Sequence, residues 1–320
     1  MRGVLVSLVA VFAALDVLAL WHVYLASLLF GLVDAFFQPA YTTLVPQVAP
    51  ADVLLGANSL TGLSQQLGWV AGPAMGAAVV SLGGTLAAFA INGLSFFLSA
   101  ACLVPLLSLT QQVVASPHTT DVLQRIREAI GFVFGTPWLW ITITVSALTN
   151  VMLTGPYSVA LPFLVKDSLH ADLGVLGLLY AMFPLGYVLA ELWTGSARRL
   201  RHQGIPGYSG LLLAGGMILM LGLPLPLIAL ALAALVNGAG LEVYSLIWTN
   251  TLQEMVPGEK LGRVASVDLL GSFGLLPIGY ALTGWATDQL GPPLVFMIGG
   301  GVTVVVAALA LVHPAIRDLD

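Results

Sequence analysis

Residues 48–60, VAPADVLLGANSL, and residues 255–267, MVPGEKLGRVASV, share a pattern that decides how this chain is organised. In each stretch a proline is followed two positions later by an acidic residue, and small residues then open a helix. A glycine-rich span that contains proline comes next and ends in Leu82-Gly83 or in Leu290-Gly291. Similarity between distant segments indicates an internal repeat, so we expect two related halves.

The composition is that of a membrane protein. Of the 320 residues, 58% are hydrophobic and 8% are charged, against about 45–50% and 25% in soluble domains. The mean hydropathy of +0.99 holds along the whole length, which excludes a soluble domain with a single anchor. The net charge of -5 excludes a basic surface for nucleic acid.

Apolar runs separated by charges, prolines and glycines predict ten membrane-spanning helices. Continuous apolar runs favour helices, because a membrane barrel would need alternating apolar and polar residues. We therefore expect an all-α polytopic membrane protein. The predicted spans are 3–20, 23–47, 57–82, 84–107, 134–157, 173–196, 208–223, 227–252, 264–288 and 292–312.

The basic residues predict the orientation. Ten spans place both termini on one side, and lysine and arginine collect on the cytoplasmic side of a membrane. Only Lys166 falls opposite the termini, so we expect both termini in the cytoplasm and the chain in the cytoplasmic (inner) membrane. The basic residues on the side of the termini are Arg2, Arg125, Arg127, Arg198, Arg199, Arg201, Lys260, Arg263 and Arg317.

Three regions are predicted along the chain. Residues 1–107 form a partial N-terminal bundle, and residues 133–320 form a C-terminal six-helix bundle. Between them, residues 108–132 carry apolar side chains on one helical face beside charged ones, which predicts an amphipathic helix on the cytoplasmic surface. This linker connects the two bundles; a helix that binds a partner is the alternative.

The repeat also predicts a missing segment. The second copy is preceded by two spans and an arginine-rich loop, whereas the first copy is preceded only by the spans that follow Met1-Arg2-Gly3. Four helices in the first half and six in the second leave two spans and their loop, about 70 residues, absent at the N-terminus. The alternative is a native ten-helix protein in which the repeat is coincidental.

At this point the sequence resembles a known family. FFQPAYTTLVPQVAPADVLLGANSL (36–60), GPAMG (72–76), AFAINGLSFFLSA (88–100) and LQEMVPGEKLGRVAS (252–266) are similar to the drug:proton antiporter branch of the major facilitator superfamily. The most similar group contains macrolide-efflux proteins and the enterobactin exporter. The resemblance implies a major facilitator fold, here N-terminally truncated. It also implies a monomeric carrier that exports a drug-like or siderophore-like molecule in exchange for protons by alternating access.

Two motifs of that family have counterparts here. Gly68, Gly72, Pro73 and Gly76 match the antiporter motif GxxxGPxxGG, although Ala77 replaces the last glycine. The family associates this motif with export; ordinary packing of a glycine-rich helix is the alternative. The gating loop survives in the second half as Gly195, Arg198, Arg199 and Arg201, without the family's aspartate.

Three acidic residues fall within predicted spans, where a charge costs about 2.5–3.5 kcal/mol. Asp34 and Glu242 lie close to mid-membrane, whereas Glu191 lies near the cytoplasmic end and precedes the arginine-rich loop. We expect Glu191 to form a structural or gating ion pair with Arg198, Arg199 or Arg201; contact with the substrate is the alternative. Asp34 and Glu242 are the predicted cavity acids, which bind protons, a cationic substrate or both. Carboxyls that are protonated and packed between helices are the alternative.

Helical spacing places other polar residues beside these acids. Gln38 and Tyr41 share a helical stripe with Asp34, Ser245 and Thr249 share one with Glu242, and Asn150 lies on a third polar stripe. By the resemblance, these three helices line the central cavity. We therefore expect the stripes to face the transported molecule.

The sequence gives no support for an enzyme or for a cofactor. A nucleotide-binding P-loop needs lysine after glycine, but Lys166 and Lys260 follow valine and glutamate. Cys102 is the single cysteine, and the five histidines lack the spacing of metal ligands. We therefore expect a gradient-driven transporter that binds a small molecule, protons and lipid. The alternative is a non-transporting, truncated or inactive membrane protein.

Overall fold

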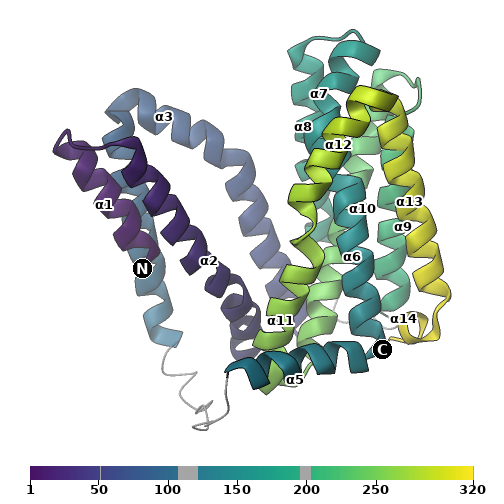
Figure 1. Cartoon of the computed structure of the whole chain (residues 1–320), viewed down its shortest axis with the longest axis horizontal. Coiled ribbons are helices and arrows are strands. Elements are labelled where there is room, and N and C mark those ends of the chain that lie inside the picture. Colours follow the sequence, from purple (N-terminus) through teal and green to yellow (C-terminus); the bar gives the residue numbers. More distant parts are fainter. Residues whose placement is uncertain (51, 107–121, 195–202, 320) are drawn as a thin grey trace. The chain divides into compact units, whose positions relative to one another are not determined.

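The computed structural model describes residues 1–50, 52–106, 122–194 and 203–319 (Figure 1). Every regular element in these ranges is helical, as the sequence predicts. Contacts divide the chain into two compact units. The first comprises Met1–Ala49 and Leu67–Thr120, and the second comprises Pro50–Gln66 and Asp121–Asp320. The predicted division at 1–107, 108–132 and 133–320 stays a prediction; residues 50–66 pack with the second unit.

The first unit is built from α1 (Arg2–Ala14), α2 (Leu20–Val48) and most of α3 (Leu54–Leu103), followed by the turn η1 (Val104–Leu106). The chain reverses between α1 and α2, where Asp16 has a φ of 56°. Gly84, with a φ of 71°, interrupts α3 because only glycine adopts this conformation without strain. The interruption falls between the predicted spans 57–82 and 84–107.

The second unit is a helical bundle with α5 across one end (Figure 1). The Glu128 carboxylate lies 3.6 Å from the Arg263 guanidinium, which joins α5 to α11. The elements are α5 (Val122–Gly135), α6 (Pro137–Gly155), η2 (Pro156–Ala160), α7 (Leu161–Phe163), η3 (Leu164–Ser168), α8 (Leu173–Thr194), α9 (Gly204–Leu221), α10 (Leu227–Met255), α11 (Gly258–Phe273), α12 (Leu276–Leu290), α13 (Pro292–Val312) and α14 (Pro314–Arg317).

Eight helical segments in the described ranges are long and apolar enough to cross a membrane, and the shorter α1 is also apolar. This finding confirms a multi-pass membrane protein. The predicted single span 264–288 is divided into α11 and α12, whose boundary lies at Gly274 and Leu275. Pro277 follows within the first turn of α12, where its missing N–H is tolerated.

Glycines let the helices of the second unit approach closely. A Cβ atom on Gly210 of α9 would lie 2.6 Å from the Gly240 carbonyl oxygen of α10, so both backbones are in direct contact. Without water between apolar helices, packing of small residues is a main source of association in membranes. The α9–α10 contact therefore depends on these two positions.

Gly210→Ala tests this contact. The added methyl group has no space beside Gly240, so we expect a loss of about 1–3 kcal/mol in the free energy of unfolding. Gly216→Ala on the same helix is the matched control, because no heavy atom lies within 4 Å of its Cβ position. Thermal unfolding of the purified protein measures both variants. Equal stability of the two variants would contradict close packing at Gly210.

Candidate functional site

Two acidic side chains meet inside the second unit. Glu191 of α8 and Glu242 of α10 are only 1% and 6% exposed. Both carboxyls face Gly62 of α3. A Cβ atom there would collide with Oε1 of Glu191 and lie 3.6 Å from Oε1 of Glu242. The two carboxyls also interact electrostatically. The structure thus brings a predicted gating residue beside a predicted cavity acid.

The close approach of α8 and α10 produces this arrangement. A side chain at Gly238 would collide with the Phe183 carbonyl, and one at Gly186 would collide with the Leu235 carbonyl. Glu242 lies one helical turn after Gly238, and Glu191 lies five residues after Gly186. Two backbones in contact therefore carry both carboxyls into the same buried volume.

The N-terminal part of α3 is fixed to these helices by polar contacts. Ser59 donates its hydroxyl hydrogen to the Glu191 carbonyl oxygen at 2.6 Å. Asn58 donates from Nδ2 to Oε1 of Gln253 at 2.8 Å. Both Ser59 and Asn58 are buried. Segment 54–66 of α3 therefore closes over the acid pair through specific hydrogen bonds.

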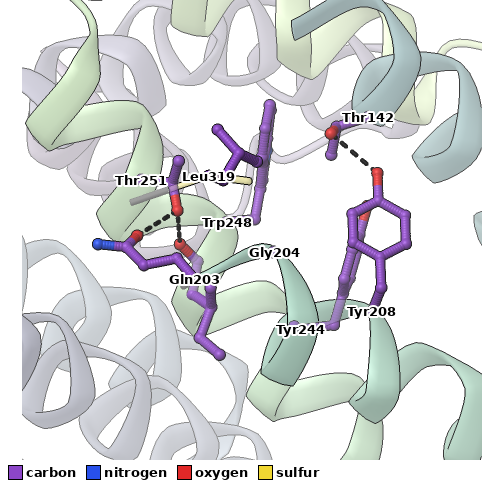
Figure 2. Close-up of a pocket in the computed structure, with 10 residues that line it drawn as sticks. Thr142, Gln203, Gly204, Tyr208, Tyr244, Trp248, Thr251 and Leu319 are labelled. Atoms are coloured by element: carbon purple, nitrogen blue, oxygen red, sulfur yellow. Dashed lines mark hydrogen bonds between the residues drawn. The ribbon is translucent and has the colours of Figure 1, made fainter. Parts of the chain in front are cut away.

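A small, mostly apolar pocket lies between α6, α9 and α10 of the second unit (Figure 2). Thr142 and Tyr208 share a hydrogen bond of 2.9 Å at one side of it. At the other side Thr251 donates to the side chain of Gln203, which in turn donates to Glu254 at 2.7 Å. Sequence reasoning missed this pocket, because its residues come from helices far apart in the chain.

In the first unit, Asp34 has a cationic partner. Arg2 Nη1 lies 3.1 Å from Oδ1 of Asp34, and the guanidinium lies 3.7 Å from the centre of the Phe37 ring. Tyr41 stacks on Phe37 at 5.6 Å, whereas Gln38 is exposed. The sequence signal was available, because Arg2 and Asp34 are nearly equidistant from the turn between α1 and α2.

The remaining predicted cavity residues lie in different surroundings. Ser245 is exposed, Thr249 is half-buried, and Asn150 donates from Nδ2 to the Ser272 carbonyl oxygen at 2.9 Å. The structure therefore joins Glu242 to Glu191, but it does not gather all the predicted polar residues at one place.

The predicted antiporter-motif residues lie on α3, whereas the predicted gating-loop residues lie outside the described residues. Gly68, Gly72 and Gly76 are exposed, and no heavy atom lies within 4 Å of their Cβ positions; Pro73 belongs to the same helix. Arg198, Arg199 and Arg201, with Gly195, lie outside the described residues. Their ion pair with Glu191 stays a prediction.

Long apolar helices with buried ionisable groups between them define a multi-pass membrane protein. The chain belongs to the Major Facilitator Superfamily, whose family model matches residues 1–267 and, in a second alignment, residues 143–317. The sequence resemblance to this family is confirmed. The chain is a transporter of small molecules and not an enzyme.

Curated proteins similar to this chain include enterobactin exporters. The chain is 27% identical to the enterobactin exporter EntS of Citrobacter koseri over 296 residues, 90% of this chain and 68% of the relative. It is 27% identical to EntS of Shigella boydii over 303 residues, 92% of this chain and 70% of the relative. For EntS of Shigella flexneri the identity is 26% over 302 residues, with the same coverage.

Ser59→Ala tests the contact between α3 and α8. The variant leaves the Glu191 carbonyl without this donor, and we expect the free energy of unfolding to fall by about 0.5–1.5 kcal/mol. Ser64→Ala is the matched control, since the exposed Ser64 hydroxyl bonds only within its own helix in the structure. Chemical unfolding in detergent measures both. A Ser59→Ala variant as stable as Ser64→Ala would argue against a stabilising contact.

Proposed function

We propose that this protein exports a drug-like or siderophore-like small molecule in exchange for protons by alternating access. The observation that carries the proposal is the buried pair Glu191–Glu242 within the bundle of a major facilitator transporter. Buried carboxyls in such bundles are costly and mark ion or proton sites. The name of the curated relatives and the motif at Gly68, Gly72, Pro73 and Gly76 support export as the direction.

In this proposal Asp34 and Glu242 have different partners. Arg2 balances the charge of Asp34, so a cationic substrate or a proton competes with Arg2 for that carboxylate. Glu242 faces another acid, so a proton stabilises it directly. Exchange of substrate and protons then alters the charge balance inside the bundle. This change shifts the equilibrium between the inward-open and outward-open states.

The basic residues support the membrane orientation that belongs to this proposal. Nine of the ten fall on the side of the termini, so both termini lie in the cytoplasm and the carrier works in the cytoplasmic membrane. The resemblance to the family adds that the carrier works as a monomer. Protons then enter from outside as the substrate leaves. Alternating access moves two bundles about a site between them, and the connector 108–132 links the bundles.

Asp34→Asn and Glu242→Gln test the proposed coupling. We expect each variant to reduce protonophore-sensitive efflux at least about tenfold, equivalent to about 1.4 kcal/mol. Cells that lack their own exporters express the full chain, and retention of a fluorescent macrolide or of enterobactin is measured with and without a protonophore.

Asp167→Asn, a change at an exposed acid, is the matched control and should transport as the unmodified protein does. Unchanged proton-coupled efflux in both acid variants would contradict their roles. If the unmodified protein alters retention of neither probe, export of these two substrate classes is contradicted.

A further inference from the structure

The carboxyl of Glu191 lacks the partners that a buried charge needs. Both of its oxygens are buried, and neither has a hydrogen-bond partner of normal geometry. The described part of the chain contains no ion pair to Glu191 or Glu242. Buried polar atoms are almost always hydrogen-bonded in native proteins, so this carboxyl calls for a ligand that the residues 1–50, 52–106, 122–194 and 203–319 do not supply.

The second carboxyl identifies the chemistry of that ligand. Two carboxylates that are ionised side by side repel each other, whereas one proton lets a carboxyl donate to a carboxylate. Among the described residues, no histidine, cysteine or further acidic side chain joins the two glutamates to form a group of three metal ligands. Divalent calcium takes six to eight oxygen ligands, so two carboxyls alone fit it poorly. A shared proton is the simplest ligand that satisfies both groups.

In the part of the chain that the structure describes, few titratable groups surround Glu191 and Glu242, so binding or loss of their own proton is the main change of charge at this place. On α8, Tyr187 interacts electrostatically with both carboxyls. On α3, residues 54–66 contain no titratable side chain. The titratable groups on α9 and α10 include Tyr208 and Tyr244, whose rings pack against each other at 5.5 Å. The arginines of 198–201 lie outside the described residues.

We propose that Glu191 and Glu242 hold one exchangeable proton between them, and that its loss releases residues 54–66 of α3 from α8 and α10. The proposal rests on the proposed function only in taking this release as a step of proton-coupled transport. Once both carboxyls are ionised, they separate and require water. Gly62 covers them directly, so water reaches the carboxyls when the contact at Gly62 opens.

The same geometry explains why position 62 is a glycine. Any side chain there would displace the Glu191 carboxyl from its place beside Glu242. The polar contacts of Asn58 and Ser59 hold segment 54–66 in place while the proton is bound. A single proton therefore controls a helix contact that is stabilised by only a few hydrogen bonds.

Infrared difference spectra of the purified full chain test the shared proton. Raising the pH should remove one protonated-carboxyl C=O band, and both Glu191→Gln and Glu242→Gln should abolish that band. In each variant the glutamine amide donates to the remaining carboxylate, so no proton is needed. Asp268→Asn is the matched control, since Asp268 is a half-buried acid that accepts hydrogen bonds from Trp248 and Ser272, and it should leave the band unchanged.

Two infrared outcomes would overturn the shared proton. A band that survives in one of the two glutamine variants would mean that one acid titrates alone. A band that disappears at constant pH when sodium replaces choline would mean that a metal cation competes for the site. Size-exclusion profiles and helix content confirm that each variant is folded.

Cysteine labelling tests the release of α3. Leu55→Cys places a thiol at a buried position of segment 54–66, and the exposed native Cys102 serves as the internal reference. As the pair loses its proton, the labelling ratio of position 55 to Cys102 should rise by up to about tenfold per pH unit, the limit for one linked proton. This rise should vanish with Glu242→Gln and persist with Asp268→Asn. The same pH dependence in Glu242→Gln would overturn the release.

Neither measurement involves a transported substrate. If both give the expected result while cells show no efflux, the export proposal fails and the shared proton stands. If efflux is proton-coupled while the carboxyl band survives in Glu191→Gln, the shared proton fails and export stands.

Discussion

The cost of keeping a carboxyl inside an apolar helical bundle is the constraint on which the rest of this structure depends. A charge within the membrane must find a partner, because lipid offers none. The chain meets this requirement in two ways. Asp34 pairs with Arg2, whose guanidinium also lies over Phe37, whereas Glu191 faces Glu242. The first solution balances charge within the protein, whereas in our proposal the second is met by one proton that the two carboxyls share.

Close helix packing makes the second solution possible. Glycines on α8 and α10 bring the two backbones into contact, and Gly62 of α3 leaves space for the carboxyls. A larger residue at any of these positions would separate the acids and admit lipid or water. The buried pair is therefore a consequence of small residues that by themselves carry no chemistry.

Much of the fold follows from the sequence, but the site follows only in part. Apolar runs predict the helices because lipid forces the backbone into that form, and the acids within them are visible at once. The partner of Glu191 was not predictable in this way. The arginines that follow it in sequence predict an ion pair, which stays a prediction because they lie outside the described residues, and packing also brings Glu191 beside Glu242 from another helix. The apolar runs do predict a break between spans 57–82 and 84–107, but they do not show that Gly84 adopts a left-handed conformation there.

The repeat makes Asp34 and Glu242 counterparts, yet their surroundings differ, and this asymmetry bears on coupling. If both acids had cationic partners, both would be ionised and balanced in charge, so a change in proton concentration would have little effect on either half. If both faced another acid, each half would need its own proton. In the exchange that we propose, a cation that displaces Arg2 acts on the first unit, and a proton acts on Glu191 and Glu242 in the second. Two different ligands can then act on one conformational equilibrium, which is what exchange transport requires.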